Sequence, residues 1–166
     1  MKSEELLTQG LQKGFAGGST RGNVDRADFT FETGHTESDE GIYHDEWTGN
    51  QLAGGQEVAR TNEDSITRVY AGGTIPIESL EALGIVKKDV IKALKKVILE
   101  HGSQIRLYED FTIELEDEQS RKWKYEYKVI DRNPEIPLTT GKEIIYFGYD
   151  EKVVFVHVFS ISPIES

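Results

Sequence analysis

A stretch near the start of the chain, Asp28–Trp47, occurs a second time further along, and this repetition constrains the fold more than any other feature. Asp28–Thr30 has the same three residues as Asp110–Thr112, at an offset of 82 positions. The correspondence continues without a gap to Tyr43, which corresponds to Tyr125. Because each copy of an internal repeat is one structural unit, the repetition predicts the architecture before any local pattern is considered.

Each copy has the pattern of one helix followed by four strands. We therefore predict two repeats, 1–76 and 77–166, within a single domain that spans 1–166. The strands come in sequential runs with short turns, which favours antiparallel sheets and the α+β fold class. Each repeat is expected to be a helix packed on a four-stranded meander. The two repeats should pack with pseudo-twofold symmetry, as the subunits of a C2 dimer do.

Local patterns place the elements within each repeat. Apolar residues at helical spacing predict helices at Ser3–Phe15, Ile77–Leu83 and Lys87–His101. Alternation of polar and apolar residues predicts strands. These strands are Asp28–Thr33, Ile42–Trp47, Gly54–Thr61 and Ile66–Ala71 in the first repeat, and Phe111–Leu115, Trp123–Ile130, Lys142–Phe147 and Lys152–Ser160 in the second. Gly14–Gly22 is expected to separate the first helix from the first strand, and His35–Glu40 to be a polar turn.

The composition narrows the functional classes. The formal net charge is −11, so the surface repels phosphate backbones and we predict no nucleic-acid binding. Cysteine is absent, which excludes disulfides and thiolate chemistry. The most apolar run, Val153–Ile161, is too short to span a bilayer, and no secretory signal opens the chain. We therefore expect a cytoplasmic protein without a membrane partner.

The chain contains no familiar cofactor or catalytic motif. Neither Gly14–Gly22 nor Gly72–Gly73 has the spacing of a phosphate loop or of a dinucleotide fingerprint. No Gly-x-Ser-x-Gly element is present, so the sequence indicates no nucleophile. We predict no cofactor and assign no catalytic residue.

An acidic cluster between His35 and Glu46 combines two histidines with several carboxylates and no basic residue. Imidazole and carboxylate groups together suit a divalent ion. The alternation of a strand, however, puts His44 and Asp45 on opposite faces, so these two side chains cannot readily share an ion. The spacings of known zinc and calcium motifs are absent, and we interpret the cluster as a solvated turn without a metal.

The strand predicted at 42–47 offers the best candidate for a site. Its alternation puts Tyr43, Asp45 and Trp47 on one face, which should turn inward because the aromatic side chains favour burial. A carboxylate there needs hydrogen-bond donors or a raised pKa. We expect Arg68 or the Tyr43 hydroxyl to be the donor, and Glu57 on the next strand could face Asp45. The candidate ligand-binding residues are therefore Tyr43, Asp45, Trp47, Glu57 and Arg68.

These residues also resemble a family motif. The resemblance rests on Tyr43, Asp45, Trp47 and Gly49, then on Gly55, Glu57 and Val58, then on a strand that ends at Gly72–Gly73. The pattern is similar to a bacterial and archaeal domain of unknown function that often follows an XRE-type helix-turn-helix. In that family a tyrosine usually stands where this chain has Trp47. The resemblance implies a sensory or regulatory module, and a single helix before the first strand leaves no room here for a DNA-binding head.

Two functions are compatible with these residues. The first is a non-catalytic module that binds a small molecule or a protein partner and serves a regulatory role. The second is a small hydrolase or isomerase that uses Asp45 and Glu57 as a carboxylate pair. The first is favoured because no spacing in the chain meets the geometric requirements of a catalytic constellation.

Overall fold

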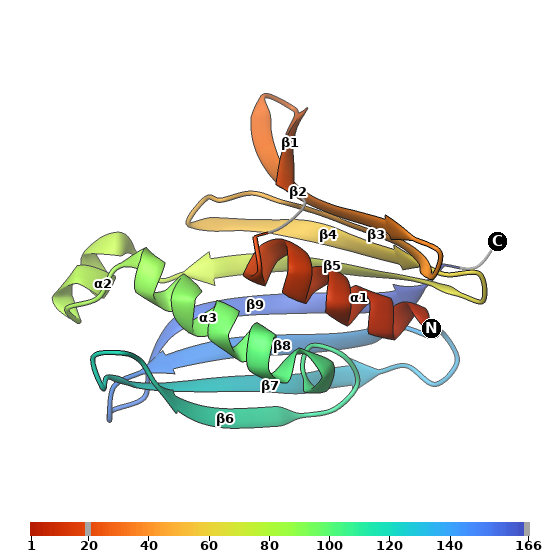
Figure 1. The fold of residues 1–166 in the computed structure, drawn as a ribbon. Helices are drawn as coiled ribbons and strands as arrows, with labels where there is room; N and C mark the ends of the chain where they lie inside the picture. Colours follow the sequence, from red (N-terminus) through yellow and green to blue (C-terminus); the bar gives the residue numbers. More distant parts are fainter. Residues whose placement is uncertain (19–20, 165–166) are drawn as a thin grey trace.

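The computed structural model of the protein describes residues 1–18 and 21–164. The strands form one antiparallel sheet of nine strands, in the order β1-β2-β3-β4-β5-β9-β8-β7-β6, and α1 and α3 lie across one face of it (Figure 1). The strands are β1 (Arg21–Arg26), β2 (Phe29–Ser38), β3 (Gly41–Trp47), β4 (Leu52–Arg60), β5 (Ser65–Thr74), β6 (Phe111–Glu116), β7 (Lys122–Arg132), β8 (Thr139–Phe147) and β9 (Lys152–Pro163). The prediction of antiparallel pairing is confirmed.

The helical segments occupy two places in the chain, before β1 and between β5 and β6. They are α1 (Ser3–Leu11), the π-helix η1 (Gln12–Ala16), α2 (Ile77–Ala82), α3 (Lys87–His101) and the 3₁₀-helix η2 (Gly102–Gln104). The Gln12 side chain donates to the carbonyl oxygen of Ile98 at 3.0 Å, which ties η1 to α3. None of the described helices has both the length and the apolar composition needed to cross a membrane.

The core lies between the helices and the covered face of the sheet. Val90, Leu94, Val97 and Ile98 recur at helical spacing on α3 and are all buried. They pack against large side chains of the sheet, among them Tyr125, Tyr127, Ile145, Phe155 and Phe159. A second cluster joins Leu6 and Leu7 of α1 to Tyr43, Ala59 and Ile66. Both clusters hold α1 and α3 against the sheet. Their packing therefore determines how much space is left between these helices and the sheet.

The predicted arrangement of two helix-plus-four-strand repeats is wrong. β5 pairs with β9 from Ile66–Pro163 to Thr74–Phe155, and this pairing joins all the strands into one sheet. Five strands precede α2, and two α-helices, α2 and α3, lie between β5 and β6. About 49% of the chain is strand and 23% helix, so the fold is mostly a single antiparallel sheet and not the predicted α+β pair of units. Pairing of β5 with β9 satisfies backbone groups that two separate meanders would leave at their edges.

Phe29 and Phe111, which the repeat made equivalent, lie in different surroundings. Phe29 is on β2, between β1 and β3, and its side chain is 58% exposed. Phe111 is on β6, the last strand of the sheet, and packs against the core below α3. Similar residues in sequence therefore give similar strands but not the same place in the fold, because tertiary contacts decide which face is buried.

The strands at the start of the sheet also differ from expectation. Residues 21–26, for which no helix or strand was predicted, form β1 and pair with β2 through a turn at Ala27 and Asp28. Both turn residues have positive φ angles, 48° and 64°, a left-handed conformation that aspartate tolerates better than most residues. β2 continues to Ser38, so most of the predicted polar turn at His35–Glu40 is strand. Pairing with β3 from Glu32 to Ser38 outweighs the polar composition.

The close approach of α1 to the sheet gives the first prediction. A Cβ atom at Gly10 would lie 2.1 Å from the buried ring of Tyr43, so Gly10→Ala should destabilise the fold by about 1–3 kcal/mol or more. At Gly14 the nearest atoms would be 3.7 and 4.0 Å away, so Gly14→Ala should be neutral or stabilising by up to about 1 kcal/mol. Urea denaturation of both variants measures the difference, and equal effects would contradict the packing of α1 on Tyr43.

Candidate functional site

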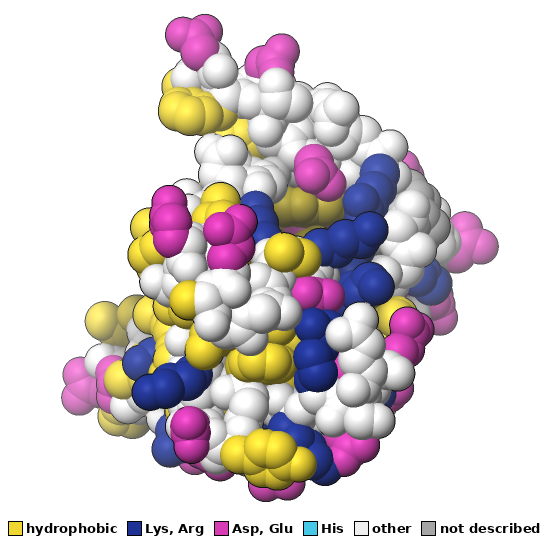
Figure 2. All heavy atoms as spheres, turned by 90° about the vertical axis from the view of Figure 1, so that its left-hand side faces the viewer, with side chains coloured by type: hydrophobic (Ala, Val, Ile, Leu, Met, Phe, Trp, Pro, Cys, Tyr) yellow, Lys and Arg dark blue, Asp and Glu magenta, His cyan; other side chains and the backbone are white. Residues whose placement is uncertain are grey.

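A cavity of about 280 Å³ lies between η1, α3 and the sheet around β3, β4 and β5. Its mouth is at the end of the molecule that carries the β3–β4 turn and the start of α3, and this end faces the viewer in Figure 2. The aromatic residues in its lining are Phe15, Trp47, Tyr70, Phe155 and His157. The lining is thus mainly apolar, with a limited number of polar groups, as is usual for small-molecule sites.

Two glycines at the end of β5 form part of the cavity wall with backbone atoms alone. Gly72 and Gly73 have φ angles of 142° and 152°, which side-chain-bearing residues rarely adopt. A Cβ atom at Gly72 would lie 2.0 Å from the carbonyl oxygen of Val156, and one at Gly73 would lie 1.8 Å from that of Gln51. Only glycine fits at either position, so no side chain from this part of β5 can fill the cavity.

Two aromatic rings and two cations of the lining lie close to one another. The rings of Phe15 and Trp47 meet edge to face at a centroid distance of 5.7 Å. The Arg21 guanidinium lies 5.9 Å from the Trp47 ring centroid, and the Lys95 ammonium lies 5.1 Å from that of Phe15. Cations at these distances from aromatic faces are attracted by the ring electrons.

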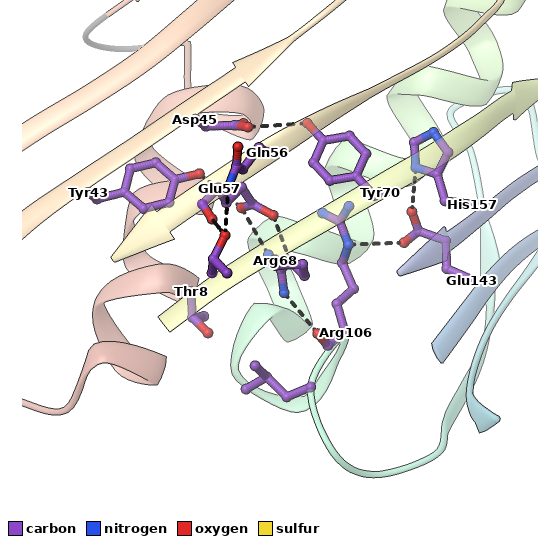
Figure 3. Close-up of polar contacts among 12 residues, drawn as sticks. Thr8, Tyr43, Asp45, Gln56, Glu57, Arg68, Tyr70, Arg106, Glu143 and His157 are labelled. Atoms are coloured by element: carbon purple, nitrogen blue, oxygen red, sulfur yellow. Dashed lines mark hydrogen bonds and ion pairs between the residues drawn. The ribbon is translucent and has the colours of Figure 1, made fainter. Parts of the chain in front are cut away.

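Beneath the cavity lies a set of buried polar side chains, which we call the buried polar cluster (Figure 3). Its members are Tyr43, Asp45, Glu57, Arg68, Tyr70, Arg106, Tyr125, Glu143 and His157. Tyr70, Arg106 and His157 belong both to the cluster and to the cavity lining. These three residues connect the cavity with the charged groups below it.

Glu57 has hydrogen-bond partners at both carboxylate oxygens. Arg68 donates to it twice, from Nε at 2.6 Å and from Nη2 at 2.9 Å, and the Tyr43 hydroxyl donates at 3.0 Å. The third nitrogen of Arg68 donates to the carbonyl oxygen of Arg106 at 2.8 Å. A bidentate pair of this kind is among the stronger polar contacts in proteins, and here it is fully buried.

Glu143 forms the second charged centre of the cluster. The hydroxyl of Tyr125 donates to it at 2.8 Å, and Nδ1 of His157 lies 3.1 Å from its other oxygen. Arg106 Nε lies 3.4 Å from Glu143, an ion pair outside hydrogen-bond geometry, so this N–H has no hydrogen-bond partner among the described residues. Burial disfavours a charged Glu143, but Arg106 and the hydrogen bond from His157 outweigh it and lower its pKa. The reciprocal attraction to Glu143 overcomes burial and raises the pKa of Arg106.

Asp45 is the group that the cluster leaves partly unsatisfied. Tyr70 donates to its Oδ1 at 3.2 Å, whereas Oδ2 is buried and has no partner among the described residues. Burial raises the pKa of Asp45 well above its usual value, and the nearby charge of Glu57 raises it further. Since Arg68 and Arg106 already balance Glu57 and Glu143, a neutral Asp45 makes the cluster electrically neutral.

The structure brings the five predicted site residues together but gives them different positions. Tyr43, Asp45 and Trp47 all face inward, which confirms the predicted orientation of the strand. Asp45 lies directly opposite Glu57, as expected. Only Trp47 lines the cavity, while the other four lie in the buried polar cluster. The predicted donors to Asp45 are wrong, because Arg68 and Tyr43 bond to Glu57 and Tyr70 bonds to Asp45.

Sequence reasoning missed several residues of the site. Tyr70 lies two positions after Arg68 on β5, so the alternation of the strand could have placed both on the same face. No sequence pattern indicated Arg106, because this residue lies in the loop after η2 and has a positive φ of 65°. Arg21 and Lys95 come from β1 and α3, which meet only in the folded chain.

The acidic segment at His35–Glu46 lies away from the cavity lining. The rings of His35 and His44 are 5.5 Å apart, and His44 Nε2 lies 3.1 Å from a carboxylate oxygen of Glu46. Arg26 also pairs with Glu46 at 3.1 Å. Residues 1–18 and 21–164 contain no group of three or more histidine, aspartate or glutamate side chains arranged to hold a metal.

Comparisons with known protein families, with curated proteins and with solved structures find no significant match to this chain. The resemblance to the bacterial and archaeal domain therefore stays a prediction.

Neutralising Asp45 and Glu57 should have opposite consequences. Asp45→Asn should stabilise the protein at neutral pH, because the fold disfavours the charged form that an aspartate adopts above its usual pKa, whereas asparagine carries no charge. Glu57→Gln should destabilise the protein by about 3–5 kcal/mol, because it leaves the buried Arg68 charge without its partner. Urea denaturation of the two variants at neutral pH tests this contrast. A loss from Asp45→Asn as large as that from Glu57→Gln would contradict a neutral Asp45.

The pH dependence of stability provides a second test of Asp45. A folded-state pKa raised above the unfolded value gives stability that is complete below the unfolded pKa and is lost as pH rises through the folded pKa. The free energy of unfolding of the unmodified protein should therefore fall relative to that of Asp45→Asn as pH rises from about 4. Denaturation midpoints of both proteins, measured from about pH 4 to about pH 8, give this difference. A constant difference over that window would show an unshifted Asp45.

Proposed function

We propose that this protein is a non-catalytic binding module that holds a small organic molecule in the cavity between η1, α3 and the sheet. The observation that carries the proposal is the cavity itself, which is lined by aromatic side chains and by two threonines whose hydroxyl groups have no partner. Oγ1 of Thr48 and Oγ1 of Thr74 are buried and have no hydrogen-bond partner among the described residues. Buried polar atoms are usually hydrogen-bonded, so unpartnered ones beside an aromatic cavity support a ligand that pairs with them.

The size of the cavity supports a compact ligand. Its volume of about 280 Å³ is close to the lower end of the range for drug-sized ligands, roughly 300–1,000 Å³. Phe15, Trp47, Tyr70 and Phe155 contribute aromatic rings to the lining. A molecule with one or two rings would contact these walls and reach the polar groups of the lining.

The contacts of the carboxylates favour binding over catalysis. The alternative, a small hydrolase or isomerase, needs Glu57 as a general base, but both of its oxygens are engaged by Arg68 and Tyr43. Asp45 is not part of the cavity lining, and His157 is engaged by Glu143. Neither Glu57 nor Asp45 therefore combines the position and the free acceptor that a base acting on a ligand in the cavity would require.

A ligand in this cavity would contact elements that are distant in sequence. The lining comes from η1 through Phe15, from the β3–β4 hairpin through Trp47, and from α3 through Ile91. Binding would stabilise the folded chain and the packing of these elements on one another. This coupling suits the sensory or regulatory role that the family resemblance implies.

A cavity-filling substitution tests the proposed function. Ile91→Trp places a larger side chain in the cavity from α3 and should abolish binding of naphthyl probes, whereas Lys88→Trp on the exposed side of the same helix should not. The probes are 1-naphthoate, 1-naphthyl phosphate and uncharged 1-naphthamide. Trp47 lines the cavity and Trp123 is the only other tryptophan of the sequence, so Trp47 emission reports binding in the Trp123→Phe variant. Ile91→Trp and Lys88→Trp each add a tryptophan, so binding to these two variants is measured by the shift in melting temperature.

The expected result is a saturable change in Trp47 emission in Trp123→Phe and a raised melting temperature with at least one probe. The rise in melting temperature should be lost in Ile91→Trp and kept in Lys88→Trp. Failure of every probe to bind, or equal binding to Ile91→Trp and Lys88→Trp, would contradict the proposed function. Circular dichroism of both variants verifies that they are folded.

A further inference from the structure

The cavity mouth has a charge that is opposite to that of the protein as a whole. Arg21, Lys87 and Lys95 contribute to the lining, and Glu32 is the one carboxylate among the described lining residues. The chain as a whole carries a formal net charge of −11. Figure 2 shows lysine and arginine side chains gathered around a hollow with hydrophobic side chains inside it. A local excess of positive charge on an acidic protein attracts anions to this place.

The three cations differ in how far their charge is already neutralised. Arg21 lies 3.6 Å from a Glu32 oxygen and also donates to the carbonyl oxygen of Phe15 at 2.9 Å. Lys87 donates to the carbonyl oxygen of Gly49, which does not cancel its charge. Lys95 has no ion pair within 4 Å among the residues that the structure describes. Partial burial and the repulsion from Arg21 lower the pKa of Lys95, and the attraction of Glu32 offsets this only in part.

The inner end of the cavity has no comparable excess of charge. Arg106 is the charged residue of the lining at that end, and its charge is balanced by Glu143 within the buried polar cluster. Between the two ends lie the rings of Phe15 and Trp47, which the mouth cations Lys95 and Arg21 approach. An anionic group therefore gains most at the mouth, and an apolar body gains most among the rings.

We propose that the cavity selects molecules with a compact aromatic body and one terminal anionic group, a carboxylate or a phosphate, which binds at the mouth between Arg21 and Lys95. This inference rests on the proposed binding function and adds the chemical class of the ligand. The anion relieves the repulsion between the two cations, and the aromatic body contacts Trp47 and Phe15. Thr48 and Thr74 also belong to the lining of this cavity.

Affinities of the three naphthyl probes for the full chain test the selection for an anion. In the unmodified protein, 1-naphthoate or 1-naphthyl phosphate should bind at least about tenfold more tightly than 1-naphthamide, which has the same ring system without charge. The tighter of the two anions identifies the preferred terminal group. The preference should decrease as salt concentration rises, because both cations are partly exposed to solvent.

Matched variants test whether the preference for anionic probes arises from the cations at the cavity mouth. Lys95→Met should reduce the anion preference to about twofold or less by weakening the two anions far more than 1-naphthamide, because it removes the charge and keeps most of the apolar part of the side chain. Lys88→Met removes a charge from the exposed side of the same helix and should keep the preference. Glu32→Gln should strengthen anion binding, because it removes the carboxylate that competes for Arg21.

The outcomes separate this inference from the proposed function. Equal affinities for 1-naphthamide and both anions would overturn the selection for an anion while the binding function stands. An equal loss of charged and uncharged probes in Lys95→Met would also overturn it, since Lys95 would then act by packing alone. Failure of all three probes to bind would remove both proposals together.

Discussion

Four buried charges lie beneath the helices, and the rest of the site is arranged around them. Glu57 pairs with Arg68, and Arg106 pairs with Glu143. These residues come from β4, β5, the loop after η2 and β8, so the contacts connect both halves of the sheet. Removing one partner from a buried pair is far more costly than the pair is worth, because the remaining charge has no compensation. The cluster therefore constrains which conformations of this sheet are accessible to the chain.

Because these four charges balance one another, they influence both the protonation of Asp45 and the net charge of the cavity wall. With Glu57 and Glu143 already balanced, burial raises the pKa of Asp45 and favours its uncharged form, and its partner Tyr70 is part of the cavity lining. The inner wall of the cavity is consequently polar but without net charge. The charges that remain available to a ligand are those at the mouth, from β1 and α3. A binding site with one charged end and one apolar end follows from this distribution.

Local features of the site could be predicted from the sequence because they depend on alternation along a single strand. The inward orientation of Tyr43, Asp45 and Trp47 and the position of Glu57 opposite Asp45 are of this kind. The bounds of α3 also follow from its apolar spacing. The architecture could not be predicted, since the repeat at Phe29 and Phe111 reflects similar strands, and pairing between β5 and β9 is a contact between distant segments. Arg106 lies in an irregular loop, where no periodic pattern operates.

The central claim is that a small aromatic anion occupies the cavity with its charged group at the mouth. A crystal structure of the full chain soaked with 1-naphthoate tests this claim most directly. The expected result is the naphthalene ring system between Trp47 and the α3 side of the cavity, with the carboxylate within ion-pair distance of Lys95 and Arg21. Naphthoate bound only outside the cavity, or inside it with the carboxylate turned toward Arg106, would contradict the claim.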